Sequence, residues 1–209
     1  MADEYSRFAD MYDRLLNPFL SHIRNKTTEM IRAENIHAIL DMGCGTGEQV
    51  EQLKQAGVNA FGVDLSAAML GQALKKNRAN PTCCRADASI TPFGNHAFDA
   101  CLFSFALHEK TSRMRQSILN EALRVTREDG WFITVDFNPS PVSSVAQRLT
   151  LGGIHWVERM AGRDHYRCYR SFMDQDGLNG LHRNFPLTLV RAVPILRGNG
   201  AIMFFRKTG

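Results

Sequence analysis

The sequence predicts an α/β fold: a doubly wound, mostly parallel seven-stranded sheet with a carboxyl-terminal antiparallel hairpin and a helical cap. Between residues 36 and 137, short apolar segments alternate with amphipathic segments of about ten residues. The apolar segments are nearly continuous hydrophobic runs, which is typical of parallel strands that helices cover on both faces. After residue 137 this alternation stops, and the chain closes with two apolar segments that flank the turn sequence "GNG".

The first 35 residues are expected to be helical. Apolar side chains recur at helical spacing over residues 8–16. Asn17-Pro18 is expected to break this helix, because proline lacks the backbone N–H that a helix interior uses, and a second helix is expected to follow through about Ala33.

Each element of the following segment is predicted from the period of its apolar residues. Strands are expected at residues 36–43, 58–64, 83–87, 98–107 and 130–137. Helices are expected at residues 48–57, closed by Gly57, after Ser66 as an amino-terminal cap, and at residues 112–126. The second of these helices would bury Met69, Leu70, Ala73 and Leu74, and the third Met114, Ile118 and Ala122.

Beyond Pro139 the sequence predicts a helical insert followed by the hairpin. Residues 142–175 are expected to form one or two helices, interrupted at Gly152-Gly153 and at Gly162, that lie over the strand ends. Residues 185–197 and 201–207 are expected to pair as the antiparallel hairpin that completes the sheet edge.

The composition suits one domain without disulfides or a structural metal. With 209 residues, 44% of them hydrophobic, the chain can bury a sizeable core. It has no apolar run of about 18 residues, and its first residues alternate in charge where a signal peptide would be apolar, so we expect a soluble, cytoplasmic protein. The five cysteines form no Cys-x-x-Cys pair, so no metal site is expected.

Charge is distributed unevenly along the chain. Residues 1–150 hold 16 Lys and Arg against 17 Asp and Glu, whereas residues 151–209 hold 9 against 4. The basic part leaves two interpretations open, an anionic partner or a solvated basic face. No separate basic recognition domain is visible, so nucleic acid is not an expected partner.

The loop after the first strand, within "ILDMGCGTGEQVEQL", predicts a ligand site. In open parallel sheets, ligands bind outside the carboxyl ends of the strands, where this loop falls. The glycines let the backbone approach a ligand, and the following helix presents free N–H groups to an anion. The spacing Gly43-x-Gly45-x-Gly47 is one residue shorter than a dinucleotide-binding loop requires, which disfavours a nicotinamide oxidoreductase.

Three acids follow the ends of successive strands and extend this site. Asp41 precedes the glycine loop, where it suits an ammonium group better than a pyrophosphate. Asp64 lies 17 residues after Gly47 and suits ribose hydroxyls, which fits either class of adenosine cofactor. Asp87 ends the third strand, where an acid can accept a hydrogen bond from an adenine amino group.

These segments resemble a known family. "ILDMGCGTG", "FGVDLS", the acid at Asp87, "FDACLFSFALHE" and "EALRVTREDGWFITVDF" are similar, in order and spacing, to the motifs of class I S-adenosylmethionine-dependent methyltransferases. The resemblance runs from about residue 5 to residue 137, and "RFADMYDRLLNPFLS" resembles the amino-terminal segment of the ubiquinone/menaquinone C-methyltransferase-like branch. It implies a Rossmann-like sheet and S-adenosylmethionine as cofactor. It also implies methyl transfer, by in-line displacement, to a small-molecule or lipid-like acceptor.

The resemblance implies that residues 1–209 form a single methyltransferase domain with four parts. Its parts would be a helical lid (1–35), a cofactor-binding core (36–137), a helical insert that caps the substrate (138–180) and the terminal hairpin (181–209).

The resemblance also assigns cofactor residues one by one. Asp41 and the loop glycines would hold the methionine portion, and Asp64 the ribose hydroxyls. The further implied contacts are Cys44 in the loop, Asp87 and Ala88 at the adenine, Leu65 and Met69 along the adenosine, Phe103, Ser104 and Leu107 beside the sulfonium, and Tyr12 as a lid.

Candidates for the reacting end are His108 and Asp136, which end the fourth and fifth strands. His108 could take a proton from the acceptor, and Asp136 could border its cavity. Candidates for acceptor contact in the insert are His155, Arg163, His165 and Tyr166.

Arginines in the insert suggest an anionic partner. Arg159, Arg163 and Arg167 would share a helical face provided that Gly162 does not break the helix. Aromatic and methionine side chains interleave with them, which would suit peripheral contact with an anionic membrane. Quinone-like rings, phospholipid head groups and small amines stay open as acceptors, as do a monomer or a homodimer. A non-catalytic S-adenosylmethionine-binding sensor or partner protein is the alternative function.

Overall fold

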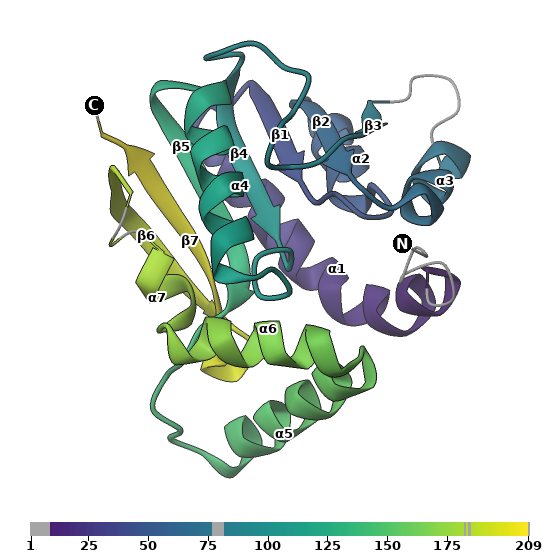
Figure 1. Cartoon of the computed structure of the whole chain (residues 1–209), viewed down its shortest axis with the longest axis vertical. Helices are drawn as coiled ribbons and strands as arrows, with labels where there is room; N and C mark the ends of the chain where they lie inside the picture. Colours follow the sequence, from purple (N-terminus) through teal and green to yellow (C-terminus); the bar gives the residue numbers. More distant parts are fainter. Residues whose placement is uncertain (1–8, 77–81, 182, 184, 209) are drawn as a thin grey trace.

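The computed structural model describes residues 9–76, 82–181, 183 and 185–208, with side chains described from Leu20 in the first helix and to Lys75 in the third. The described residues form a seven-stranded sheet in the order β3-β2-β1-β4-β5-β7-β6 (Figure 1). The strands are β1 (Ala38–Met42), β2 (Asn59–Asp64), β3 (Cys83–Arg85), β4 (Phe98–Ser104), β5 (Thr126–Phe137), β6 (Leu187–Ile195) and β7 (Gly200–Lys207).

The first five strands are parallel, β7 runs antiparallel to β5, and β6 pairs antiparallel with β7, so β7 is the one reversed strand among the described residues. The final strand, β7, lies between β5 and β6, so β6 forms the outer edge. The chain proceeds from β1 outward to β2 and β3 and then crosses to β4 on the other side of β1. This reversal makes the carboxyl ends of β1 and β4 the place where a ligand is expected in an open α/β sheet. The predicted fold class is confirmed.

Helices cover both faces of the sheet and one end of it. They are α1 (Ala9–Ala33), α2 (Glu48–Gln55), α3 (Ala67–Lys76), α4 (Ser112–Val125), α5 (Val145–Met160), α6 (Arg163–Asp174) and α7 (Gly177–Leu181), with a short 3-10 turn at Leu196–Gly198. Helices α1 and α2 pack with one apolar cluster and α4, α6 and α7 with the other. Figure 1 shows α5 and α6 below the carboxyl ends of β4 and β5. The predicted cap therefore lies over the strand ends.

The two-sided burial follows from the alternation of side chains along each strand. In β1, Ile39 faces the cluster of α1 and α2, while Leu40 faces the cluster of α4 and α6. In β4, Leu102 and Phe103 divide in the same way. Each such side chain is almost fully buried, which stabilises the fold by roughly 1.5–3 kcal/mol relative to exposure.

Three local predictions were wrong. Helix α1 continues through Asn17-Pro18, because its later half is held by tertiary packing of Ile23, Met30 and Ile31 against the sheet. Gly152-Gly153 lies inside α5, where the two exposed glycines cost only about 1 kcal/mol each. Leu74 and Met114, expected on apolar helix faces, are 50% and 46% exposed.

The interruption predicted at Gly162 is confirmed, because this residue lies between the two cap helices. Its φ of 124° lies in the region that favours glycine, and it separates α5 from α6. Arg159 therefore belongs to a different helix from Arg163 and Arg167, and the predicted common arginine face is not formed. Within α6, Arg167 pairs with Asp164 at 3.2 Å.

Candidate active site

The glycine loop uses its three glycines for different reasons. All three have positive φ, 91° at Gly43, 54° at Gly45 and 72° at Gly47. A Cβ added at Gly43 would lie 2.9 Å from the Cβ of Ala106, and one at Gly47 would lie 3.0 Å from the Cβ of Ala73. A Cβ at Gly45 would meet no described atom within 4 Å. Packing thus requires the outer glycines, whereas the middle one faces open space.

Asp64, at the end of β2, closes this loop. Its Oδ2 accepts a hydrogen bond from the backbone N–H of Gly45 at 2.8 Å, and its Oδ1 accepts one from Ser66 at 2.8 Å. Ser66 in turn caps α3, because its hydroxyl accepts from the N–H of Met69 at 3.2 Å, as the sequence predicts. Burial raises the pKa of the Asp64 carboxyl, and the two backbone hydrogen bonds oppose that rise. Asp64 therefore organises the loop, and the ribose contact stays a prediction.

Asp41, at the end of β1, is a buried acid that is only partly satisfied. Its side chain is 1% exposed, and its Oδ1 has no hydrogen-bond partner among the described residues. Burial raises the pKa of this carboxyl well above its ordinary value, and nearby Cys83 and Asp64 raise it further. A buried unsatisfied oxygen is costly, so its presence beside the glycine loop indicates a site for a hydrogen-bond donor or a cation.

The other predicted cofactor residues fall into two environments. Leu65 is 60% exposed after β2, and Asp87 is exposed, with its Oδ1 accepting from both the N–H and the hydroxyl of Ser89. Phe103 and Leu107 are fully buried in the cluster beneath α4. Of the rest, Cys44 and Met69 are buried, Ala88 and Ser104 are half-buried, and the side chain of Tyr12 lies outside the described residues.

His108 and Asp136, predicted as candidates for the reacting end, are in direct contact. The Nδ1 of His108 lies 2.7 Å from the Oδ1 of Asp136, and both side chains are buried. The Oδ2 of Asp136 accepts from the backbone N–H groups of Leu107 and His108 at 3.1 and 3.2 Å. Burial lowers the pKa of His108, but the charge and hydrogen bond of Asp136 outweigh it, with help from Glu158, and raise it to about 9.

The cap contributes two further members of this cluster. Glu158 of α5 places Oε2 3.6 Å from the Nε2 of His108 and 2.7 Å from the Nε2 of His165, which comes from α6. The Nδ1 of His165 lies 3.9 Å from the Oε2 of Glu109, and Glu109 pairs with Lys110 at 2.6 Å. Among the predicted residues, the structure therefore brings together His108, Asp136 and His165.

Glu158 and Glu109 were not among the residues predicted from the sequence. Glu158 carried a usable signal, because it occupies the same helical face as Gln147, Leu151 and Ile154, where an acid would be out of place unless paired. Phe105 was not predicted either; its φ of 52° is unusual for a bulky residue and marks a forced turn at the end of β4. Its N–H donates to the carbonyl of Val135 at 2.7 Å, which holds this turn to β5.

The remaining cap candidates lie apart from the cluster. The hydroxyl of Tyr166 is 3.4 Å from the Nδ1 of His155, and the guanidinium of Arg159 lies 5.0 Å from the centre of the Tyr166 ring. Arg163 is exposed at the start of α6 and lies outside the histidine cluster.

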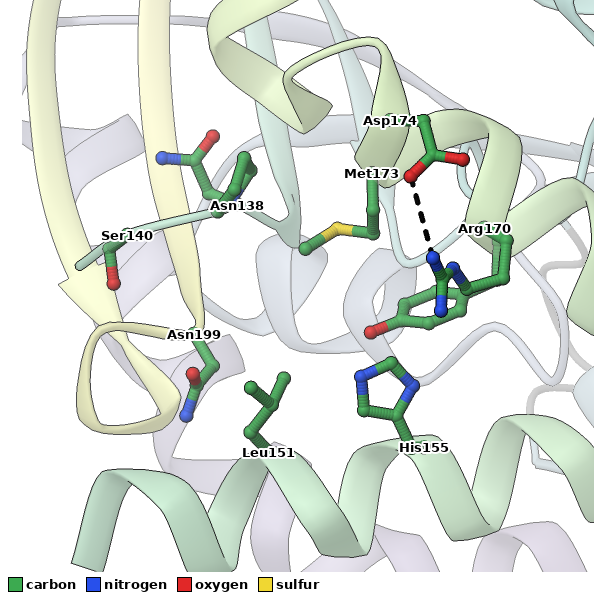
Figure 2. Close-up of a pocket in the computed structure, with 10 residues that line it drawn as sticks. Asn138, Ser140, Leu151, His155, Arg170, Met173, Asp174 and Asn199 are labelled. Atoms are coloured by element: carbon green, nitrogen blue, oxygen red, sulfur yellow. Dashed lines mark ion pairs between the residues drawn. The ribbon is translucent and has the colours of Figure 1, made fainter. Parts of the chain in front are cut away.

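Between α5, α6 and the segment after β5 lies a cavity of about 250 Å³. Figure 2 shows Leu151 and His155 rising from α5 toward Arg170 and Met173 of α6, with Asn138 and Asn199 on the sheet side. Arg170 pairs with Asp174 at 3.7 Å on its rim. Its lining also includes Tyr169, a buried residue whose hydroxyl has no hydrogen-bond partner among the described residues. The Tyr169 ring also contacts His108, with centres 6.3 Å apart, so the cavity adjoins the histidine cluster.

Comparison with known proteins identifies the family. A model of the methyltransferase domain matches residues 40–134. The demethylmenaquinone methyltransferase of Thermobifida fusca is 31% identical over 171 residues, which cover 76% of this chain and 71% of that protein. The chain belongs to the S-adenosylmethionine-dependent methyltransferases.

This methyltransferase is also similar to other proteins. The ubiquinone/menaquinone biosynthesis C-methyltransferase UbiE of Zymomonas mobilis is 26% identical over 220 residues, covering 97% of this chain and 90% of that protein. The chain spans 59% of an uncharacterized Methanocaldococcus jannaschii protein to which it is 30% identical. The magnesium protoporphyrin IX methyltransferase of Synechocystis, solved with bound SAH, superposes with a TM-score of 0.61 at 17% identity, covering 90% of this chain and 83% of that one. This likeness confirms the Rossmann-like fold.

The cofactor of this methyltransferase is S-adenosylmethionine, and the residues present fit it. The unpartnered Oδ1 of Asp41 matches a positively charged amino group, and the open space over Gly45 admits a ligand against bare backbone. None of the helices in the described part of the chain has the length and hydrophobicity that crossing a bilayer requires.

Proposed function

We propose that this methyltransferase acts on a small-molecule or lipid-like acceptor with a hydroxylated, quinone-like ring, by in-line displacement. One observation carries this proposal: a buried polar cluster borders the donor loop and is roofed by the cap. Gly43 of the loop faces Ala106, and His108 follows two residues later. The short segment from Ala106 to His108 thus meets the donor-binding loop at one end and the polar cluster at the other.

Within this scheme, the donor is held by groups at three strand ends. We assign Asp41 to the amino group of the methionine portion, Asp64 to the ribose hydroxyls and Asp87 to the adenine. When bound, S-adenosylmethionine supplies an activated methyl group. The main task of the protein is then alignment and exclusion of water, since orientation of two reactants supplies roughly 7–11 kcal/mol, against about 3–5 kcal/mol from a general base.

We assign His108 to bind and orient the acceptor oxygen and Asp136 to position His108. Asp136 holds the Nδ1 of the imidazole, which leaves Nε2 directed toward the cap residues Glu158 and His165. The cluster is rich in carboxylates, so it favours an acceptor that donates hydrogen bonds, as the hydroxyls of a reduced quinone ring do. The names of the relatives, demethylmenaquinone and ubiquinone/menaquinone methyltransferases, support the same class of acceptor.

The outer face of α5 supports a lipid-like acceptor. Val145, Leu149, Trp156 and Met160 form an apolar stripe along this helix, and each is at least 65% exposed. Arg148 and Arg159 are exposed along one border of the stripe. An apolar stripe with basic residues at its edge suits the interface of an anionic membrane. We infer that α5 rests on such a surface, from which a lipid-soluble acceptor would reach the cap.

The test is methyl transfer by the purified chain. The chain is incubated with S-adenosylmethionine carrying a labelled methyl group and a short-chain demethylated quinol, and the product is measured by mass spectrometry. We expect labelled product and S-adenosylhomocysteine in equal amounts. If the donor binds in calorimetry while quinols, phospholipids and small amines all stay unmodified, the chain is a binding protein and the proposal fails.

A further inference from the structure

We propose that His108, Glu158 and His165 form a binding site for a divalent transition-metal cation of the zinc or iron(II) class. The three residues come from the segment after β4, from α5 and from α6, so the cation would lie where the cap meets the sheet. This inference goes beyond the proposed methyl transfer; with the cation bound, the acceptor oxygen assigned to His108 would bind to the cation instead of to Nε2.

The spacing of the three ligand atoms suits a small cation. Glu158 Oε2 lies 2.7 Å from His165 Nε2 and 3.6 Å from His108 Nε2, and the three ligand atoms all lie within 4.8 Å of one another. With metal–ligand distances of about 2.1 Å, tetrahedral ligand atoms lie about 3.4 Å apart. The observed distances bracket this value, so rotations of the side chains alone can close the site.

The residues behind the ligands hold them in the form that a metal needs. Asp136 Oδ1 lies 2.7 Å from His108 Nδ1, which fixes the proton on that nitrogen and leaves Nε2 free as a ligand. Asp136 is itself held by the backbone N–H groups of Leu107, His108 and Phe137. A carboxylate behind a metal-binding histidine is the usual arrangement in proteins.

Charge and burial at the site also favour a cation. The side chains of His108 and Glu158 are 6% and 7% exposed, and that of His165 is 15% exposed. Asp136, Glu158 and Glu109 bring three carboxylates to two imidazoles, and Lys110 is paired with Glu109. With both imidazoles neutral, as ligation requires, the cluster carries an excess of negative charge in a water-poor place.

Two histidines and one carboxylate are a common ligand set for zinc and iron(II). Such a set leaves coordination positions open for water or for an oxygen of a bound molecule. Because the ligands join β4 to both cap helices, a bound cation would also fasten the cap to the sheet.

The test is cation binding by the full chain after treatment with EDTA, in the absence of donor and acceptor. Titration with Zn²⁺ is followed by calorimetry, and titration with Co²⁺ by its visible absorption. We expect one equivalent to bind, with the absorption of low-symmetry Co²⁺ and a rise in melting temperature. Failure to saturate with either cation overturns the proposal and leaves methyl transfer untouched.

Three variants test the ligands. Glu158→Gln and His165→Gln keep the size of the side chains, and each should weaken binding at least about 100-fold. Asp136→Asn, which acts only through His108, should weaken it about 10- to 100-fold. S-adenosylmethionine binding by each variant reports whether the fold is intact. Equal cation affinity of the wild type, Glu158→Gln and His165→Gln would show binding elsewhere and would overturn the assignment.

The chain offers a matched control on its surface. His96 Nδ1 lies 3.6 Å from Glu128 Oε1, the same separation as between His108 and Glu158, but both side chains are exposed. His96→Gln should leave Zn²⁺ and Co²⁺ affinity unchanged. Loss of binding in this variant alone would move the site to the surface and contradict the proposal.

Discussion

The Nδ1 atom of His108 lies 2.7 Å from the Oδ1 atom of Asp136, and this buried contact joins the ends of two neighbouring strands. Glu158 and His165 of the cap close the cluster around it. If His108 orients the acceptor as proposed, this contact makes its position depend on the packing of β4 against β5, because Asp136 also accepts hydrogen bonds from the backbone N–H groups of Leu107 and His108.

Asp136→Asn should lower the turnover number at least about tenfold and leave donor affinity unchanged, because the amide cannot hold His108 as the carboxylate does. Turnover is measured by product formation and donor affinity by calorimetry. Asp164→Asn, at an exposed ion pair of α6, is the control and should behave as wild type. A tenfold loss of donor affinity in Asp136→Asn would place this residue at the donor instead.

Asp41→Asn should have opposite effects on binding and on stability. Loss of the charge should weaken S-adenosylmethionine binding at least about tenfold, as a charge-assisted hydrogen bond contributes about 1.5–3 kcal/mol. The free energy of unfolding at neutral pH should rise, because a buried carboxylate with a raised pKa destabilises the folded chain once the pH exceeds its unfolded pKa. Calorimetry and urea unfolding measure the two effects. A variant that is less stable and binds the donor normally would refute the assignment.

The glycine loop allows a paired test. Gly43→Ala should lower the free energy of unfolding by more than Gly45→Ala. Both variants share the strain of a positive φ, but only the Cβ added at Gly43 also meets a neighbour, Ala106. Gly45→Ala should instead weaken donor binding more than it destabilises the chain, because its methyl group enters the open space. Urea midpoints and donor affinities of the two variants are compared, and equal losses in both measurements would contradict this division.

Glu121 should contribute to the dependence of the free energy of unfolding on pH. The hydrogen bond from Arg124 lowers the pKa of Glu121, and hydrogen bonds from Thr91 lower it further. Together they outweigh burial, which raises it, and bring the pKa from an ordinary 4.5 to about 2. The stabilisation is therefore fully present above about pH 4.5 and is lost as the pH falls toward 2. Glu121→Gln should be clearly less stable than wild type at pH 6, and the difference should narrow at pH values below about 4.5. A difference independent of pH would show that the charge is not the cause.

Helix α5 should bind vesicles that contain anionic lipid. Trp156 is 66% exposed on its stripe, whereas Trp131 is buried, so a blue shift of tryptophan fluorescence on addition of vesicles reports Trp156. Leu149→Asp should abolish the shift, and raised salt should weaken it because Arg148 and Arg159 contribute. The chain could instead self-associate and fail to bind vesicles. If Leu149→Asp abolished that self-association, the stripe would be assigned to contact with a second copy of the chain.

The architecture could be predicted because it depends on local periods that each segment carries by itself. The apolar runs of β1, β2 and β4, the amphipathic helices between them and the closing hairpin all have their own signal, and the observed sheet matches. Pro18 misled the prediction because tertiary packing stabilises α1 beyond its local propensity, and Gly152-Gly153 misled it because two exposed glycines inside α5 cost only about 1 kcal/mol each. The subdivision into lid, core and cap stays a prediction, as do the individual cofactor contacts.

The polar cluster could be predicted only in part. His108, Asp136 and His165 were visible as isolated polar residues, but their convergence depends on how α5 and α6 turn back over β4 and β5, and the turn is set by Gly162. Glu158 could have been suspected as an acid on a buried helical face. The hydrogen bond that Asp64 accepts from Gly45 could not, since it spans 19 residues of chain.

The cap occupies one unbroken stretch of chain between β5 and β6, whereas Asp41, Asp64 and Asp87 all precede β4. Under the proposed assignments, recognition of the donor and choice of acceptor are therefore separable along the chain. On that proposal, a change in α5 or α6 would redirect the enzyme toward a new compound while the methyl source stays the same, and Glu158 and His165 are two cap positions that would transmit such a change to His108.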